Sequence, residues 1–227
     1  EASRIALKYM TPVVLLTDGY LANGSEPWKI PDVVDMKSID VKFAEGVKDG
    51  EEYLPYLRNE KTLARPWAIP GIPGLEHRVG GLEKEENTGH VSYDPDNHHR
   101  MVEIRQEKVN RIQNDIAETE VYGEENGDVL ILSWGGTFGS CRSAVESLLE
   151  QGKSVSHVHL RWISPLPKDL AEIIIKFKNV LVPEINMGQL IKLIRSEYLV
   201  DAKGLNQVNG KPISTSKIIE TVNKIIG

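Results

Sequence analysis

The sequence predicts an α/β fold: a mostly parallel sheet in three layers, with helices on both faces, preceded by a long irregular segment. From residue 126 onward, short apolar runs alternate with amphipathic segments of helical length. This alternation is typical of βαβ units with right-handed crossovers, which place parallel strands side by side. Strands are expected at residues 129–134, 155–162 and 179–183, and helices at residues 140–151, 168–177, 187–198 and from Ser214 or Ser216 to residue 226.

The residues justify these elements one by one. The run at residues 129–134 is continuously apolar, as in a strand buried on both faces. Gly152 ends the helix that follows the turn. Asn186 is a suitable N-cap, and apolar side chains follow it at a spacing of three and four residues. A short edge strand is expected at residues 205–208.

The chain opens with a predicted helix and a predicted strand. Residues 1–9 have an apolar helical face but neither a cap nor an initiating Met, so we expect the chain to be part of a longer polypeptide. The apolar run at residues 12–17 predicts a strand buried on both faces. Asp18 follows it at the edge where open α/β sheets bind ligands. It is therefore a candidate site or interface residue, with a simple turn as the alternative.

Residues 20–93 show little periodicity and contain many prolines. Aromatic side chains such as Trp28 and Trp67 indicate that this stretch lies against a folded surface. Asp94 and Pro95 predict the start of a long helix, because they suit the N-cap and the first helical position. The sequence therefore divides into residues 1–30, an irregular linker with a connector helix at residues 31–125, and the regular α/β domain at residues 126–227.

Composition argues against several classes of function. The 227 residues carry a net charge of −6, whereas nucleic-acid binding needs a clustered basic surface. No apolar run approaches the about 20 residues that span a bilayer, so no membrane partner is expected. The single cysteine, Cys141, fits a reducing, cytoplasmic location. It cannot by itself supply the about four thiolates that hold an iron–sulfur cluster.

Two motifs have a structural and a functional interpretation. The turn at residues 134–139 lies between a strand and a helix, where phosphate often binds. Trp134 stands where the dinucleotide motif needs glycine, so a tight turn is favoured over nucleotide binding. His157 and His159 alternate along a strand and therefore face one side. A structural role is favoured for both over zinc, because no third ligand lies at a suitable spacing, and no metal ligand is assigned.

Two further places concentrate ionisable groups. The loop at residues 70–84 is rich in Gly and Pro and carries His77 and Arg78. An imidazole handles protons near neutral pH and a guanidinium offers a planar fork to a carboxylate, although a solvated charged loop is the alternative. Glu184 follows the strand at residues 179–183. It is expected either to act at a ligand site or subunit interface or to bond nearby backbone amides.

Several blocks of sequence carry a resemblance to a known family. They are TPVVLLTDGYLA at residues 11–22, ARPWAIPG at 64–71, GLEHRVGGLE at 74–83, VSYDPDNH at 91–98, WGGTFG at 134–139, HVHLR at 157–161 and VPEINMGQL at 182–190. With these blocks the chain resembles, over essentially its whole length, the carboxy-terminal part of alpha subunits in the 2-oxoacid:ferredoxin oxidoreductase superfamily, in particular the 2-oxoglutarate:ferredoxin oxidoreductases.

The resemblance implies a domain plan and a reaction. Residues 1–30 would end a thiamine pyrimidine-binding domain, and residues 126–227 would form a transketolase carboxy-terminal-like domain. The family decarboxylates a 2-oxoacid on thiamine diphosphate, transfers the acyl group to coenzyme A and passes electrons through a [4Fe-4S] cluster to ferredoxin. With 2-oxoglutarate the products are succinyl-CoA and CO2. The beta subunit is the expected partner and would hold the diphosphate, the magnesium and the cluster, so no cofactor is expected to be bound by this chain itself.

The resemblance also bears on the site residues. The glutamate that activates the cofactor would precede Glu1, so we expect no catalytic residue in this chain and no activity from it alone. The connecting loop is expected to run over the active site, which makes His77 and Arg78 candidates for binding the tail of the oxoacid. Arg78 facing a distal carboxylate would favour 2-oxoglutarate. Two alternatives stay open: a non-catalytic subunit-interaction domain, and the beta subunit of a thiamine-dependent oxoacid dehydrogenase.

Overall fold

The computed structural model describes residues 1–47 and 50–227. These residues divide into two compact units. The first, called the N-terminal unit, consists of residues 1–15 and 27–115, and the second, called the C-terminal unit, consists of residues 16–26 and 116–227.

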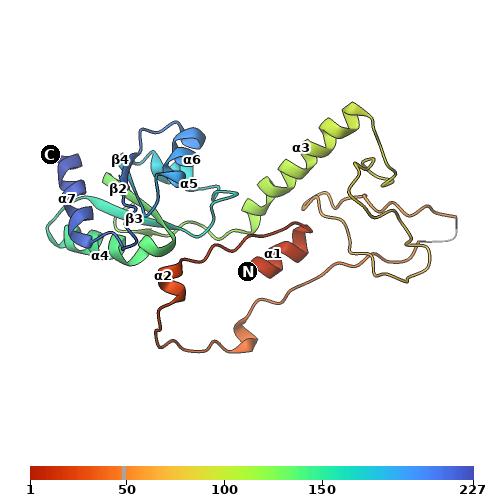
Figure 1. Ribbon diagram of the computed structural model, residues 1–227, viewed down its shortest axis with the longest axis horizontal. Coiled ribbons are helices and arrows are strands. Elements are labelled where there is room, and N and C mark those ends of the chain that lie inside the picture. The colour runs from red at the N-terminus through yellow and green to blue at the C-terminus, as the bar shows by residue number, and fades with distance from the viewer. Residues whose placement is uncertain (48–49) are drawn as a thin grey trace. The chain divides into compact units, whose positions relative to one another are not determined.

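A five-stranded sheet forms the centre of the C-terminal unit (Figure 1). Its strands are β1 (Val121–Tyr122), β2 (Gly127–Trp134), β3 (Val155–Leu160), β4 (Phe177–Glu184) and β5 (Lys203–Asn206), in the spatial order β1-β3-β2-β4-β5. β2 is parallel to both β3 and β4, β4 is parallel to β5, and β1 is antiparallel to β3. The mostly parallel sheet predicted from the sequence is confirmed.

Helices cover both faces of this sheet, as predicted (Figure 1). Alternate residues of β2 face opposite ways because side chains in a strand have a period of two. Ile131 packs in one apolar cluster with Leu148, and Leu130 packs in another with Ile194. The first cluster lies under α4 (Phe138–Glu150) and α7 (Thr215–Ile226), and the second under α5 (Leu170–Ile174) and α6 (Gln189–Tyr198).

Several boundaries differ from the prediction. The helix expected at residues 168–177 is shorter, because Phe177 joins β4 as a buried strand residue. α6 begins at Gln189 rather than at residue 187, because Gly188, with φ of 85°, turns the chain before the first helical residue. β5 lies two residues before the expected edge strand, and β1 has too few residues to show a pattern of its own.

The N-terminal unit contains the helices α1 (Ala2–Tyr9) and α3 (Pro95–Arg111) and long irregular segments. The expected cap of α3 is present, since a carboxylate oxygen of Asp94 accepts from the Asn97 amide at 2.8 Å. Trp67 fastens the irregular chain to α1, because its indole Nε1 donates to the carbonyl of Leu7 at 3.0 Å. Trp28 does not act in this way, since it is 73% exposed.

The strand expected at residues 12–17 is absent, which corrects the prediction. Val14, Leu15 and Leu16 are 79%, 74% and 66% exposed. A strand depends on backbone hydrogen bonds to a neighbouring strand. No strand of the described residues pairs with this run, so its apolar side chains stay in solvent.

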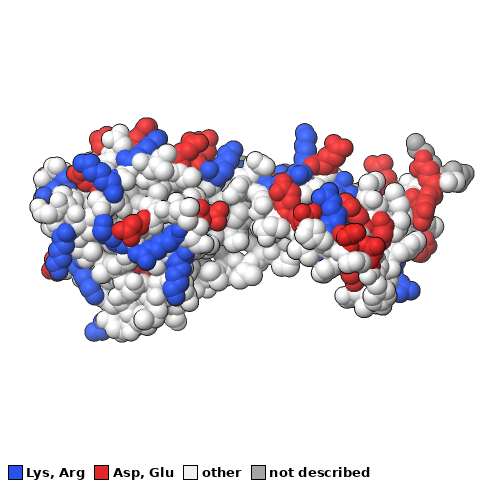
Figure 2. Space-filling model, turned by 90° about the horizontal axis from the view of Figure 1, so that it is seen from above, with Lys and Arg blue, Asp and Glu red and all other residues white. Residues whose placement is uncertain are grey.

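The surface mixes charges of both signs. Figure 2 shows acidic and basic side chains interspersed over the face in view. In the part of the chain that the structure describes, no helix combines the length and the apolar character that crossing a membrane requires.

Candidate functional site

Polar side chains gather where the parallel strands of the C-terminal unit end. Ser133 lies opposite His159 in the register of β2 and β3, and its hydroxyl oxygen is 2.7 Å from Nε2 of His157 and 2.8 Å from Nδ1 of His159. We call these three residues the serine–histidine cluster. The hydroxyl has one proton, so it donates to one imidazole and accepts from the other. The two histidines face one side, as their alternation predicts.

Burial keeps both imidazoles neutral. It lowers the pKa of His157 to about 3, with the neighbouring His159 and Arg142 adding to the effect. Burial, with Arg142 and Arg161, also lowers the pKa of His159 to about 4. Ser133 is fully buried. The serine–histidine cluster is therefore a hydrogen-bonded side-chain contact between β2 and β3 rather than a proton relay open to a substrate.

The helix that follows the turn closes this cluster. The guanidinium of Arg142 lies 3.6 Å from the ring centroid of Tyr122, and the ring of Phe138 lies edge-on to His159 at 5.0 Å. Nδ1 of His157 and Nε of Arg142 are buried without a hydrogen-bond partner among the described residues. No group of three or more His, Cys, Asp or Glu among them could hold a metal ion.

Cys141 lies on the same helix. It is fully buried, and burial raises the pKa of its thiol to about 12 even though Ser133 and Thr137 bond to it. A buried thiol of this kind is a poor nucleophile. The residue packs inward with the apolar cluster under α4 and α7.

Glu184 is completely buried at the end of β4. One carboxylate oxygen accepts from the amide of Leu190 at 2.8 Å and the other from the amide of Ile191 at 3.1 Å. Trp134 and Asn186 donate side-chain N–H groups to it at 3.3 and 3.1 Å. The carboxylate thus satisfies free amides at the start of α6. This geometry favours the backbone-amide interpretation of Glu184 over a ligand site or interface.

Asp18 lies against the turn after β2. A Cβ on Gly136 would lie 2.5 Å from the carboxylate Oδ2 of Asp18, so a larger residue at position 136 would require this side chain to move. Asp18 also caps the short helix α2 (Gly19–Ala22) by accepting from the Tyr20 amide at 2.8 Å. A carboxylate in this position repels an anion. The turn at residues 134–139 therefore does not fit a phosphate group.

His77 and Arg78 belong to the N-terminal unit, whereas Asp18 and Glu184 belong to the C-terminal unit. Nδ1 of His77 donates to the carbonyl of Leu75 at 2.8 Å, and its ring lies edge-on to Tyr53 at 5.6 Å. When the imidazole is neutral, this bond leaves Nε2 as an acceptor. Arg78 is exposed and has no hydrogen-bond or ion-pair partner among the described residues. Both side chains are thus exposed to solvent in this unit.

The loop that carries His77 and Arg78 is held by hydrogen bonds at its C-terminal end. Lys84 is buried, and its ammonium donates to the carbonyls of Gly80 and Leu82. Glu83 accepts from Nδ1 of His98 at 2.7 Å, and this bond holds the pKa of the Glu83 carboxyl below its usual value. The start of α3 therefore fixes one end of the loop that carries His77 and Arg78.

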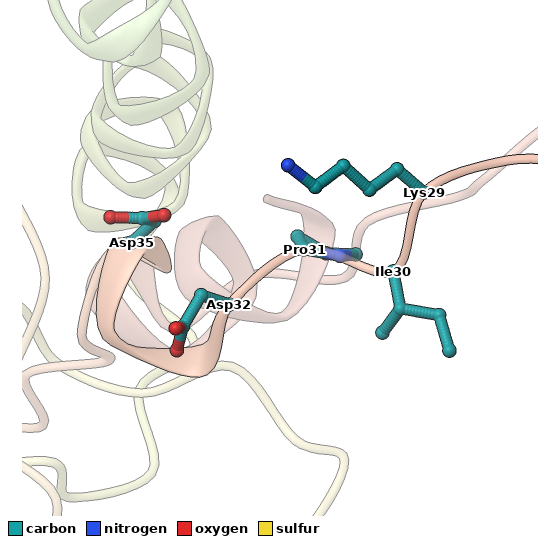
Figure 3. Close-up of a pocket in the computed structure, with 5 residues that line it drawn as sticks. All are labelled: Lys29, Ile30, Pro31, Asp32 and Asp35. Carbon is teal, nitrogen blue, oxygen red and sulfur yellow. The ribbon is translucent and has the colours of Figure 1, made fainter.

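A hollow in the N-terminal unit is lined by Lys29, Ile30, Pro31, Asp32 and Asp35 (Figure 3). All five come from one short stretch of chain, and Ile30 points into solvent with 79% of its side chain exposed. No second segment is among the residues that line it. We build no site on it.

Sequence analysis missed two members of this region, Ser133 and Arg142. The signal for Ser133 is present: it is a polar residue near the end of an otherwise apolar strand, and in the sheet it pairs directly with His159. Arg142 carries no comparable signal, because its contact with Tyr122 depends on β1, which the sequence does not reveal.

Two family models match the chain. Residues 1–94 match the model described as pyruvate flavodoxin/ferredoxin oxidoreductase, thiamine diphosphate-binding. Residues 127–218 match the pyruvate:ferredoxin oxidoreductase core domain II. Both models describe parts of oxidoreductases that pass electrons to ferredoxin or flavodoxin.

Individual relatives agree with these models. The chain is 45% identical to 2-oxoglutarate oxidoreductase subunit KorA of Mycobacterium tuberculosis over 92% of its own length and 32% of the relative. It is 28% identical to the alpha subunit of 2-oxoacid:ferredoxin oxidoreductase 1 of Aeropyrum pernix over 100% of its length and 36% of the relative. The chain thus spans about a third of the length of these relatives.

A solved structure is similar over nearly the whole chain. It is the 2-oxoglutarate:ferredoxin oxidoreductase from Magnetococcus marinus with 2-oxoglutarate, coenzyme A and succinyl-CoA bound. The TM-score is 0.90 at 32% identity, over 99% of this chain and 39% of that chain. The chain belongs to the alpha subunits of the 2-oxoacid:ferredoxin oxidoreductase superfamily. This membership favours the first of the three interpretations of the sequence over a dehydrogenase beta subunit.

Proposed function

We propose that this chain is part of the alpha subunit of a thiamine diphosphate-dependent 2-oxoglutarate:ferredoxin oxidoreductase. The complete enzyme would decarboxylate 2-oxoglutarate, transfer the succinyl group to coenzyme A and reduce ferredoxin. The observation that supports this most strongly is the 45% identity to the KorA subunit over 92% of the chain. The structural similarity to an enzyme with 2-oxoglutarate and succinyl-CoA bound supports the same substrate.

The turn after β2 is a poor fit for the diphosphate of the cofactor. Trp134 and Asp18 occupy the two places at the turn after β2 where a phosphate cradle needs glycine and open space. We therefore propose that thiamine diphosphate, magnesium and the [4Fe-4S] cluster are held by a beta subunit together with parts of the alpha subunit outside this chain. This chain would then have no catalytic residue and no activity alone. The cytoplasmic location stays a prediction.

The assay for this proposal uses the full-length protein with its accompanying subunits. Reduction of ferredoxin is measured with 2-oxoglutarate and with pyruvate, each with and without coenzyme A. We expect CoA-dependent reduction and a kcat/KM that favours 2-oxoglutarate. An equal or higher kcat/KM for pyruvate would refute the assigned substrate.

Within this function we propose that Arg78 binds the distal carboxylate of 2-oxoglutarate, with His77 beside it. The support is the exposed guanidinium, without a partner among the described residues, on a loop fastened by Lys84. Arg78→Ala is expected to raise the KM for 2-oxoglutarate by about tenfold or more, because a charged hydrogen-bond pair is lost. The KM for pyruvate, which has no distal carboxylate, should not rise.

Arg100→Ala is the matched control for Arg78→Ala. Arg100 is also exposed and lies on α3 of the same unit, where it pairs loosely with Glu86 at 3.6 Å. Its removal should leave both KM values unchanged. An unchanged KM for 2-oxoglutarate in Arg78→Ala would show that Arg78 does not bind the distal carboxylate.

A subunit-interaction role is the second candidate function. It is favoured by large apolar side chains exposed on the C-terminal unit, with Met187 79% and Leu199 90% exposed. Met187→Asp with Leu199→Asp should release the accompanying subunit in size-exclusion chromatography if these side chains lie in the interface. Intact assembly with normal turnover would count against it. The two roles are compatible in one subunit.

A further inference from the structure

A cavity of about 370 Å³ lies within the N-terminal unit. Three segments line it: α1, residues 38–42, and the turn at residues 59–67. Its volume is in the range of small-molecule sites, about 300 to 1,000 Å³. Four lining residues are cations, namely Arg4, Lys8, Lys42 and Arg65. Asp40 is the single carboxylate among the described lining residues.

Hydrogen bonds between the three segments give the cavity fixed walls. Trp67 donates its indole N–H to the Leu7 carbonyl of α1 at 3.0 Å, and its backbone amide donates to the Lys42 carbonyl at 2.8 Å. The turn closes on itself, since the Asn59 amide donates to the Ala64 carbonyl at 2.8 Å. The cations therefore project from a connected frame rather than from a loose loop.

The two arginines have most of their donors unused. Arg4 is only 17% exposed, and its one partner among the described residues is an ion pair with Asp115 at 3.8 Å. Arg65 donates a single hydrogen bond, from Nη1 to the Pro55 carbonyl at 2.9 Å, and its guanidinium stacks 4.2 Å from the Tyr56 ring. A guanidinium has five N–H donors, so both side chains keep donors that could bind an oxyanion.

Each lysine of the cavity has a close carboxylate partner, whereas Arg4 has only the more distant Asp115 and Arg65 has none among the described residues. Lys8 pairs with Asp115 at 2.7 Å and Lys42 with Asp40 at 2.9 Å. The charge of Arg65 also acts on Arg58 and Lys108, which do not line the cavity. Burial, followed by the charges of Arg58, Arg65 and Arg105, lowers the pKa of Lys108 to about 8. The described lining residues therefore carry four positive charges and one negative charge.

We propose that this cavity binds a small organic anion with two or more phosphate or carboxylate groups, held by the forks of Arg4 and Arg65. A planar guanidinium matches both kinds of oxyanion through paired N–H groups. Lys42, which is 80% exposed at its side chain, adds attraction at the rim. The proposal does not depend on the proposed enzymatic function, and its failure would leave that function untouched.

The test is isothermal titration calorimetry on the full-length protein with its accompanying subunits, using inorganic pyrophosphate and citrate as the probes. At least one probe is expected to bind the wild type. The double variant Arg4→Gln/Arg65→Gln should weaken that binding by about tenfold or more, because two charged forks are lost. Binding of pyrophosphate alone identifies a phosphate ligand, binding of citrate alone a polycarboxylate, and binding of both the shared oxyanion chemistry.

Matched variants separate binding from folding. Arg100→Gln removes the same charge from the N-terminal unit outside the cavity and should leave the affinity unchanged. Lys42→Gln alters only an exposed lining residue and should weaken binding by about threefold, since a solvated charge contributes modestly. If neither probe binds the wild type, or if the double variant binds as the wild type does, the proposal is wrong.

Discussion

The hydroxyl of Ser133 bonds two histidines that burial keeps neutral. The cost of a buried charge explains their state better than any catalytic demand, since Arg142 lies nearby and would repel a protonated imidazole. At the scale of single residues, the serine–histidine cluster is a structural polar contact. Its chemical consequence is a dependence of stability on pH.

The serine–histidine cluster should make the C-terminal unit sensitive to acid. In the unfolded chain both imidazoles titrate near pH 6.5, whereas in the folded protein the pKa of His157 is about 3 and that of His159 about 4. Below pH 6.5 the unfolded state therefore binds more protons, and the stability present above that pH is lost as the pH falls. Two such groups should lower the free energy of unfolding by about 2 kcal/mol between about pH 6.5 and 5.5.

Urea denaturation followed by circular dichroism at several pH values measures this effect. The double variant His157→Asn/His159→Asn should remove this part of the pH dependence whatever its own stability. His99→Asn, which alters a largely exposed histidine on α3, should retain it. A wild-type stability that does not change over this interval would contradict the neutral assignment.

Among the elements, α6 depends on a carboxylate that comes from the preceding strand. Glu184→Gln keeps the size of the side chain but removes its charge from the amides of Leu190 and Ile191. We expect a loss of about 2 kcal/mol in the free energy of unfolding, as for a buried hydrogen bond to a charged group. Chemical denaturation measures it, with the exposed Glu172→Gln of α5 as the control. Equal midpoints for both variants would show that Glu184 does not cap the helix.

In the turn between β2 and α4, Gly136 has no Cβ at the place where the Asp18 carboxylate lies. Gly136→Ala should displace Asp18, because the new atom would lie 2.5 Å from its carboxylate. Amide hydrogen exchange in residues 16–26 is expected to become faster. Gly139→Ala, where a Cβ meets nothing within 4 Å, should not change it.

A double-mutant cycle tests the same contact independently. In an Asp18→Ala background, Gly136→Ala should have little further effect on exchange in residues 16–26, because coupled residues do not act additively. Additive effects of the two substitutions would mean that the turn and Asp18 are not in contact.

At the scale of the whole molecule, two units have their own internal contacts. Leu130 is fully buried in the centre of the sheet, so Leu130→Ala should cost about 2 to 5 kcal/mol. Hydrogen exchange measured by mass spectrometry should become faster in β2, β3 and β4 but not in α3. Equal acceleration in α3 would mean that the two units unfold as one.

Regular elements with a repeating pattern were predictable from the chain alone. The parallel sheet, the helices on both faces and the cap of α3 follow from runs such as residues 129–134 and from Asp94 and Pro95. The prediction of a strand at residues 12–17 was wrong. An apolar run indicates a segment that tends to be buried, but it does not show whether a neighbouring strand is present to pair with it. The three-part division of the chain and the roles of His77 and Arg78 stay predictions.

The sequence by itself determined the fold class and the family, because periodicity, caps and motif blocks are local properties of neighbouring residues. Only the tertiary structure decided that Glu184 caps a helix, that Asp18 fills the space beside Gly136, and that Arg4 and Arg65 line one cavity. These relations join residues far apart in the chain. Their distances and burial depend on how separate segments pack, which no single stretch of sequence encodes.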